Sequence, residues 1–155
     1  MIAPGVVAGL APFWLTGWKI HPPLLGASAF RYVGAALTCV GGIGLLDSFV
    51  RFAVQGLGTP APVFPTERLI VTGLYRHVRN PMYVAVVAMI LGQALLVGSP
   101  TLLVYSAAIW LAFHLFVVAY EEPALTRRFG PDYAVYRAGV PRWIPRLSPW
   151  RPSGD

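Results

Sequence analysis

The chain has 155 residues, of which 56% are hydrophobic and 12% are charged, and its mean hydropathy is +0.62. A soluble domain averages about 25% charged residues, so this composition argues against a water-soluble fold and indicates one small membrane domain. The formal net charge of +6 does not indicate nucleic-acid binding, because no nucleic-acid motif accompanies the basic residues. One cysteine and three histidines supply too few ligands for a metal site.

Two apolar segments precede the first long polar region, and we expect them to form an N-terminal helical hairpin over residues 1–50. The first, residues 2–18, contains Pro4 and Pro12 and is predicted to be kinked. The second, residues 24–50, follows the break at Lys19-Ile-His-Pro-Pro. Asp47 and Arg51 are four residues apart at its end, which predicts an ion pair on one helix face. Arg31 is expected to extend outward from the second segment.

The loop 51–80 leads to a second helical hairpin over residues 81–122. Asn80 is a suitable N-cap and Pro81 suits the first helical position. Ser99-Pro100 repeats this signal, which predicts spans at 81–98 and 101–122 joined by a tight turn. Residues 80–120 contain no Asp, Glu, Lys or Arg, and about 20 apolar residues cross a bilayer as a helix.

The tail 123–155 interleaves aromatic and basic residues, and short interfacial helices are predicted near 123–129 and 132–138, ended by Gly130 and Gly139. The loop and the tail together hold ten of the 12 basic residues. The positive-inside rule therefore predicts that both termini are cytosolic, in the cell membrane if the source is prokaryotic. The predicted fold is an all-α polytopic integral membrane bundle of about four transmembrane helices plus short C-terminal interfacial helices.

Two sequence blocks carry chemistry, and both lie at predicted cytosolic helix ends. The first reads Thr72-Gly-Leu-Tyr-Arg-His-Val-Arg-Asn-Pro-Met-Tyr83. The second begins with Tyr120-Glu-Glu-Pro123 and continues with Phe129-Gly-Pro-Asp-Tyr-Ala-Val-Tyr136 and Val140-Pro-Arg-Trp-Ile-Pro145. In order and spacing they resemble the catalytic signature of the isoprenylcysteine carboxyl methyltransferase and phospholipid methyltransferase superfamily. The resemblance covers residues 66–146.

The resemblance implies a methyltransferase that binds S-adenosylmethionine at the cytosolic ends of the third and fourth helices. Carboxylates suit the amino group and ribose hydroxyls of this donor, arginine suits its carboxylate, and aromatic faces suit adenine and the sulfonium. The residues expected to bind the donor are Tyr75, Arg76, His77, Asn80, Pro81, Tyr83, Glu121 and Glu122. Relatives carry His directly before the proline where this chain has Asn80, so either His77 or Asn80 is the candidate for that role.

The residues expected to act in catalysis are Arg79, Tyr83 and His114. His114 is an ionisable residue inside a predicted span, which makes it a functional candidate. It is seven residues before Glu121, so a regular helix would place both on nearly one face; a hydrogen bond to Gln93 is the alternative role. The two glutamates are about 100° apart on a helix, and Pro123 would loosen the backbone enough for both to turn inward.

The sequence therefore predicts methyl transfer from S-adenosylmethionine to a lipid or lipid-like acceptor in the bilayer, with no nucleic-acid partner. A prenylcysteine carboxylate and a phospholipid amine both remain open as acceptors. Two other readings also remain open: a membrane protein with a binding or structural role and no catalysis, and a nicotinamide-dependent membrane reductase of similar architecture.

Overall fold

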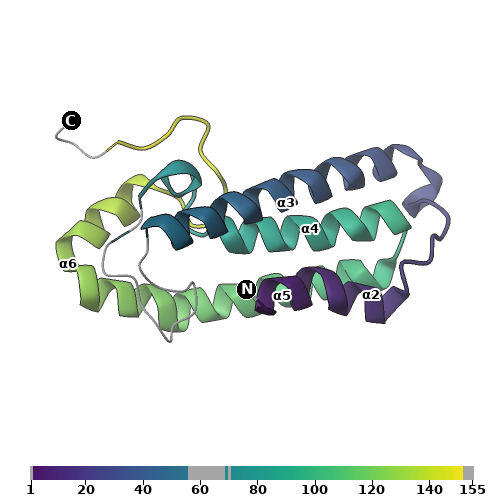
Figure 1. Ribbon diagram of the computed structural model, residues 1–155, viewed down its shortest axis with the longest axis horizontal. Coiled ribbons are helices and arrows are strands. Elements are labelled where there is room, and N and C mark those ends of the chain that lie inside the picture. The colour runs from purple at the N-terminus through teal and green to yellow at the C-terminus, as the bar shows by residue number, and fades with distance from the viewer. Residues whose placement is uncertain (1, 56–68, 70, 152–155) are drawn as a thin grey trace. The chain divides into compact units, whose positions relative to one another are not determined.

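The computed structural model describes residues 2–55, 69 and 71–151, and within them every regular element is helical (Figure 1). The prediction of an all-α fold is thus confirmed for this part of the chain. Most of the predicted loop 51–80, namely residues 56–68 and 70, and the last four residues of the predicted tail lie outside the described residues. The larger helices are α2 (Ala11–Thr16), α3 (Ala29–Gln55), α4 (Pro81–Val97), α5 (Pro100–Phe116) and α6 (Glu122–Gly139).

Two helical stretches are long and apolar enough to cross a membrane, Ala29–Arg51 and Pro100–Gly139. The other two predicted spans correspond to the shorter apolar helices Val6–Thr16 and Pro81–Val97, so the number of four spans stays a prediction. Large apolar side chains face outward, with Val40 65%, Ile43 68% and Val104 72% exposed. An apolar exterior of this kind suits a lipid surrounding better than water.

The N-terminal helix contains a wide, π-helical turn, and a proline explains it. The π-helical turn η1 (Val6–Leu10) separates α1 (Ile2–Gly5) from α2, and the Ala11 N–H bonds to the Val6 carbonyl five residues back. Pro12 follows at once and has no N–H to give, so the helix widens before it rather than breaking. The kink predicted for the first segment is therefore a wide turn inside a helix.

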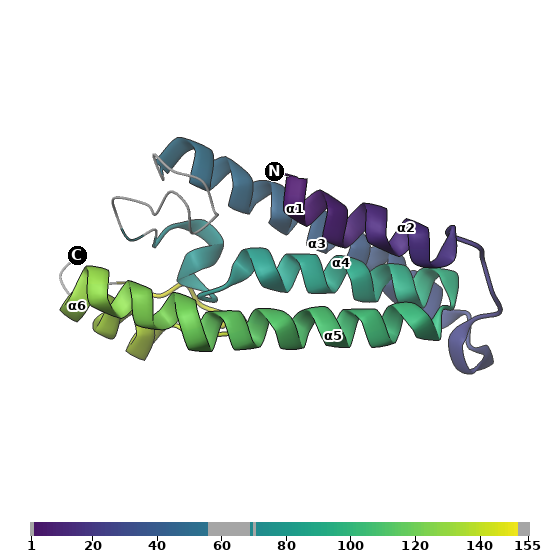
Figure 2. The same ribbon diagram turned by 90° about the horizontal axis from the view of Figure 1, so that it is seen from below.

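The chain divides into two compact units, and the first contains residues up to Ile43 together with Tyr83–His114. Within it, α4 and α5 form the predicted antiparallel hairpin, visible in both ribbon views (Figures 1 and 2). Helix α4 ends at Val97, and α5 begins at Pro100. The turn depends on Gly98, with φ of 69°, and on the Ser99 hydroxyl, which accepts a bond of 3.4 Å from the Leu102 N–H.

Glycines let α3 and α4 approach closely inside the first unit. A Cβ on Gly34 would lie 2.6 Å from the Gly92 carbonyl oxygen, and a Cβ on Gly92 would lie 2.6 Å from the Thr38 nitrogen. Neither position has room for a side chain. Small residues at a helix contact allow the close backbone packing that associates helices in lipid.

The Gln93 side chain ties the N-terminal helix to α4. Its amide nitrogen donates to the Ala8 carbonyl at 2.7 Å, and its oxygen accepts from the Trp18 indole N–H at 3.1 Å. Gln93 is 8% exposed, so these bonds satisfy polar groups that would otherwise be buried alone. His114, for which the sequence suggested Gln93 as a partner, stacks on the Trp110 ring at 5.4 Å between centroids.

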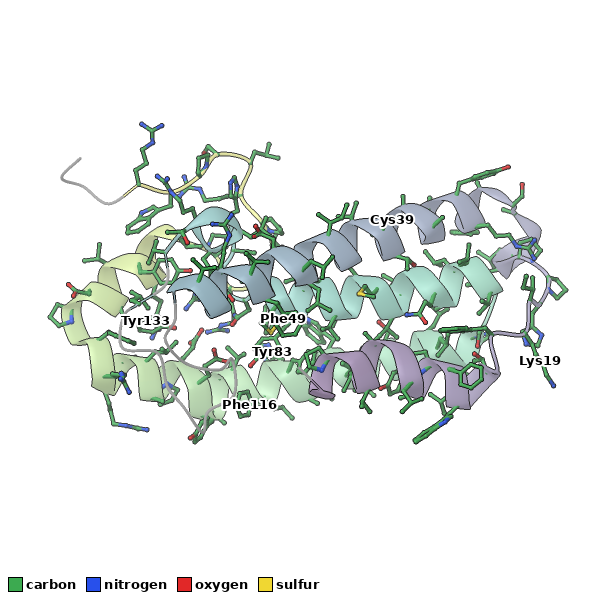
Figure 3. All side chains as sticks on the ribbon, in the orientation of Figure 1. Lys19, Cys39, Phe49, Tyr83, Phe116 and Tyr133 are labelled. Atoms are coloured by element: carbon green, nitrogen blue, oxygen red, sulfur yellow. The ribbon has the colours of Figure 1, made fainter. Side chains whose placement is uncertain are left out.

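The second unit contains Gly44–Met82 and Leu115–Asp155 as far as these are described. Its core is formed by the buried residues Tyr133, Tyr136 and Val140, with Leu69, Val71, Leu125, Phe129 and Trp150 packed against them. The predicted ion pair is confirmed, since the Arg51 guanidinium donates to Asp47 at 2.8 Å. Figure 3 shows Tyr133 on α6.

The predicted tail helices differ from the structure in one respect. The π-helical turn η4 (Val117–Glu121) links α5 directly to α6, so no break separates the fourth predicted span from the first tail helix. Pro123 again follows the wide turn, as Pro12 does in the N-terminal helix. The expectation that His114 and Glu121 share a helix face assumed a regular α-helix, and η4 removes that assumption. The predicted break at Gly130 is confirmed by its non-helical backbone, φ 49° and ψ −121°.

Candidate functional site

The first sequence block forms a tight turn that places its aromatic and polar groups inside the second unit. Gly73 has a φ of 53° and opens the short 3₁₀ helix η3 (Gly73–Arg76). A left-handed φ is accessible to glycine without strain, which explains this residue at the start of the turn. Tyr75 and Asn80 follow, each 8% exposed, and Pro81 begins α4 as predicted.

The segment after α6, residues 140–150, lies along the first block and is called the C-terminal strap here. Backbone hydrogen bonds of 2.8–3.0 Å join the two segments: Arg79 N–H to Pro141 O, Arg146 N–H to His77 O, and Trp150 N–H to Arg76 O. The strap has no helix or strand of its own in the described residues. The pairing with the first block satisfies the Arg146 and Trp150 N–H groups and the Pro141 carbonyl of the strap.

Side chains of the first block also hold the strap. The Arg76 guanidinium Nε donates to the Trp150 carbonyl at 2.6 Å, and the Asn80 amide donates to the Arg142 carbonyl at 3.2 Å. His77 Nδ1 lies 2.8 Å from the Arg146 carbonyl oxygen. Since a carbonyl can only accept, this contact requires a proton on Nδ1. Arg76, His77 and Asn80, which the sequence assigned to donor binding, thus fix the strap in place.

The strap brings a second arginine to the acidic pair. Glu122 is 7% exposed and accepts a bond of 2.8 Å from Arg79 Nη1. Arg142 donates two hydrogen bonds to the same carboxylate, from Nε to Oε1 at 2.7 Å and from Nη2 to Oε2 at 2.9 Å. This bidentate geometry is the strongest form of an arginine–carboxylate pair. The residues Arg79, Glu122 and Arg142 are called the ion cluster below.

The ion cluster has an excess positive charge, because two guanidiniums share one carboxylate. The hydrogen bond to Glu122 raises the pKa of Arg142 above its ordinary value, which favours the charged form of this guanidinium. Arg79 Nη1 also lies 3.4 Å from the Tyr133 hydroxyl. Arg79 Nε is buried and has no hydrogen-bond partner among the described residues. Buried donors without a partner are uncommon in folded proteins, so this N–H is available to a further hydrogen-bond acceptor.

The two glutamates have different surroundings. Glu122 is buried and held by the ion cluster, whereas Glu121 is only partly buried and lies in the wide turn η4. The sequence left two possibilities for this pair: either one glutamate points inward, or both do. The burial pattern distinguishes them, with Glu122 as the inward residue.

Two of the predicted catalytic residues belong to the first unit. The Tyr83 ring packs on Phe113 with centroids 4.6 Å apart, and His114 stacks on Trp110. The ion cluster and the strap belong entirely to the second unit. The roles of Tyr83 and His114 therefore stay predictions.

Sequence reasoning missed Arg142 as a site residue, although it stands in the Val-Pro-Arg block that contributed to the resemblance. It also missed the Tyr136 hydroxyl, which donates to the Tyr75 carbonyl at 2.7 Å and fastens α6 to the first block. The signal for both was present in the sequence, since each occupies a position of the tail pattern. Their contacts connect residues 20 and 61 positions apart, which no local periodicity reveals.

Comparison with known proteins identifies the family. The profile of the phospholipid methyltransferase family matches residues 30–132, about two thirds of the chain. The chain belongs to this family. It is also 36% identical over 83 residues to the protein-S-isoprenylcysteine O-methyltransferase of Schizosaccharomyces pombe (strain 972 / ATCC 24843), a match that covers 52% of this chain and 35% of that relative. No solved structure matches the chain.

The family and the relative's name both indicate a methyltransferase, and they confirm the resemblance stated from the sequence blocks. Membership of this family, together with two helices long enough to cross a membrane, also indicates membrane association. The family profile ends at residue 132, before Arg142 and the rest of the strap.

Proposed function

We propose that this protein transfers a methyl group from S-adenosylmethionine to an acceptor that resides in the membrane, with both chain termini in the cytosol. The ion cluster is the observation that carries the proposal. It unites Arg79 of the first block, Glu122 of the acidic pair and Arg142 of the strap, the three sequence elements on which the methyltransferase resemblance rests.

The ion cluster suits the donor's amino-acid end. A carboxylate from the donor would meet an excess of positive charge and the buried Nε–H of Arg79, which has no partner among the described residues. Arginine recognises carboxylates through such paired N–H groups. In the transfer, the acceptor's nucleophile bonds to the methyl carbon as the carbon–sulfur bond breaks, and the electron pair of that bond goes to the sulfur. S-adenosylhomocysteine then leaves as a neutral thioether.

The remaining roles follow from what each side chain offers. Glu122 is committed to two guanidiniums and acts as a positioning residue for them. Glu121, half-buried and next to it, is assigned to the donor's amino group or ribose hydroxyls. Arg76, His77 and Asn80 act through the strap that they hold. Tyr83 offers an aromatic face to the sulfonium or the adenine, an attraction that aromatic rings give to cations.

The acceptor is assigned to the lipid phase. The family name refers to phospholipids and the relative's name refers to isoprenylcysteine, and both acceptors would enter from the bilayer. A carboxylate acceptor needs no base, whereas an amine must lose a proton, which the His114 imidazole could receive. In either case the protein mainly aligns the two reactants and excludes water, so proximity supplies much of the rate.

Two measurements test the proposal. Purified protein in detergent is titrated with S-adenosylhomocysteine and, separately, with reduced nicotinamide dinucleotide; micromolar binding of the first alone is expected. Native membranes are then incubated with methyl-labelled donor, and a labelled lipid-soluble product is expected only when active protein is present. Binding of the nicotinamide, or binding of neither compound, would overturn the proposal in favour of a reductase or a protein without catalysis.

A matched pair of variants localises the binding. Glu121→Gln is expected to weaken S-adenosylhomocysteine binding at least tenfold, because a hydrogen bond to a charged group contributes about 1.5–3 kcal/mol. Asp132→Asn removes an exposed carboxylate from α6, and it should leave binding unchanged. Equal affinities in the two variants would remove Glu121 from the donor site.

A further inference from the structure

The first unit contains a cavity of about 650 Å³ that the methyl-transfer proposal does not use. Its walls come from the N-terminal helix at Gly9, from Trp18, from α3 at Arg31 and Thr38, and from α4 at Met89 and Gln93. Its volume lies within the range of about 300–1,000 Å³ typical of ligand pockets. All the residues that form it lie in the first unit.

The polar groups of this wall are already satisfied, with one exception. Gln93 and the Trp18 indole bond to one another, and Gln93 also bonds to the Ala8 carbonyl. The Thr38 hydroxyl donates to the Gly34 carbonyl at 2.9 Å. Arg31 differs: one of its terminal nitrogens donates to the His21 carbonyl at 2.8 Å, but its Nε is buried without a partner among the described residues.

The charge of Arg31 has no counterpart in its own unit. Residues 2–43 and 83–114 contain Lys19 and Arg31 but no Asp and no Glu. A partly buried charge is costly unless an opposite charge accompanies it. The chain supplies no such anion within this unit, so an anionic ligand would give Arg31 the opposite charge that its own unit lacks.

A ligand for this cavity must therefore combine an anion with an apolar body. We propose that the cavity binds one anionic phospholipid of the surrounding bilayer, with its phosphate against the Arg31 guanidinium and an acyl chain against the apolar wall. Guanidinium recognises phosphate oxygens through paired N–H donors. This lipid site is independent of the proposed methyl transfer, because none of the residues in the ion cluster contributes to it.

Native mass spectrometry of the detergent-purified chain tests the proposal with two lipids of equal acyl chains, dioleoylphosphatidylglycerol and dioleoylphosphatidylcholine. We expect one phosphatidylglycerol to bind at least tenfold more tightly than phosphatidylcholine. Arg31→Gln should abolish this preference. Lys19→Gln removes the other positive charge of the unit without altering the cavity wall, and it should keep at least half of the preference.

A second matched pair of variants tests the apolar part of the site. A Cβ on Gly9 or on Gly5 meets nothing within 4 Å, and only Gly9 lines the cavity. Gly9→Leu should fill the cavity and weaken binding of phosphatidylglycerol at least tenfold, whereas Gly5→Leu should not. Equal affinity of the wild-type chain for both lipids refutes an anion-selective site, whatever the variants do. Unchanged binding in Gly9→Leu refutes the cavity as its location, and a change of oligomeric state in that variant would mean that a second copy of the chain covers it.

Discussion

Substitution of Glu122 by Gln gives the sharpest test of the ion cluster. The carboxylate accepts three hydrogen bonds, one from Arg79 and two from Arg142. Gln keeps the shape but removes the negative charge, and its NH₂ group would face guanidinium donors. The side chains of Glu122 and Arg79 are each 9% exposed, whereas Arg142 is 30% exposed, so water can resolvate Arg142 far better than Arg79.

The magnitude follows from that difference in exposure. Removing one member of a buried ion pair costs about 3–5 kcal/mol. Because Arg142 recovers part of its hydration, we expect the lower end of this range, about 3 kcal/mol. Part of this loss lowers the free energy of unfolding of the whole protein, and the rest lowers the free energy of opening the strap. Each 1.4 kcal/mol corresponds to a factor of ten, so the strap should open ten- to a hundredfold more often.

Hydrogen–deuterium exchange measures this opening directly. Peptides that cover residues 140–151 contain the Arg146 and Trp150 amides, which bond to the first block, and they should exchange at least tenfold faster in Glu122→Gln. S-adenosylhomocysteine affinity should fall at least tenfold in the same variant. Arg142→Gln should reproduce the faster exchange, and Asp132→Asn should change neither quantity. Wild-type exchange together with wild-type affinity in Glu122→Gln would refute the role given to the ion cluster.

Three further predictions address the helices and the topology. Gly92→Ala should destabilise the protein by about 1–3 kcal/mol, since the new methyl group would overpack the contact with α3; Gly42→Ala, whose Cβ meets nothing within 4 Å, should be near neutral in the same thermal unfolding assay. His114→Ala should leave S-adenosylhomocysteine affinity within about threefold but slow methyl transfer at least tenfold, as expected for a group that serves the acceptor; full activity would make it structural. Cysteines engineered in 56–64 and 148–155 should be labelled only after the membrane is permeabilised, and labelling of intact cells would reverse the orientation.

The helices were predictable because their signals are local. Asn80-Pro81 and Ser99-Pro100 mark the starts of α4 and α5, and Gly130 marks the break in α6. The wide turns were harder to predict, because a proline in an apolar helix can break, bend or widen it. Here both Pro12 and Pro123 follow a π-helical turn. Only the packing of the whole helix decides among these outcomes.

The residue types of the ion cluster stand in the sequence blocks, but the pairing of these residues could not be predicted, and their role in donor binding stays a prediction. Two elements were identified from the sequence blocks, Arg79 and the acidic pair, yet which glutamate turns inward depends on η4. The Val-Pro-Arg block marks Arg142 as a candidate, but its partner Glu122 could not be predicted, because the strap that carries Arg142 has no periodic pattern. The strap reaches Glu122 through backbone bonds to the first block, and such long-range pairing leaves no signature in neighbouring residues.

The wide turn η4 bears on how this chain should be aligned with its relatives. Val117 and Glu122 are both buried although they are five residues apart, a spacing that a regular α-helix would turn by about 140°. A π-helical turn accommodates one extra residue, as a single-residue insertion does, and this is consistent with the burial of both side chains. A relative without this turn would present the first glutamate of its pair where this chain presents the second. An alignment without a gap here would then equate two carboxylates that occupy different positions in space.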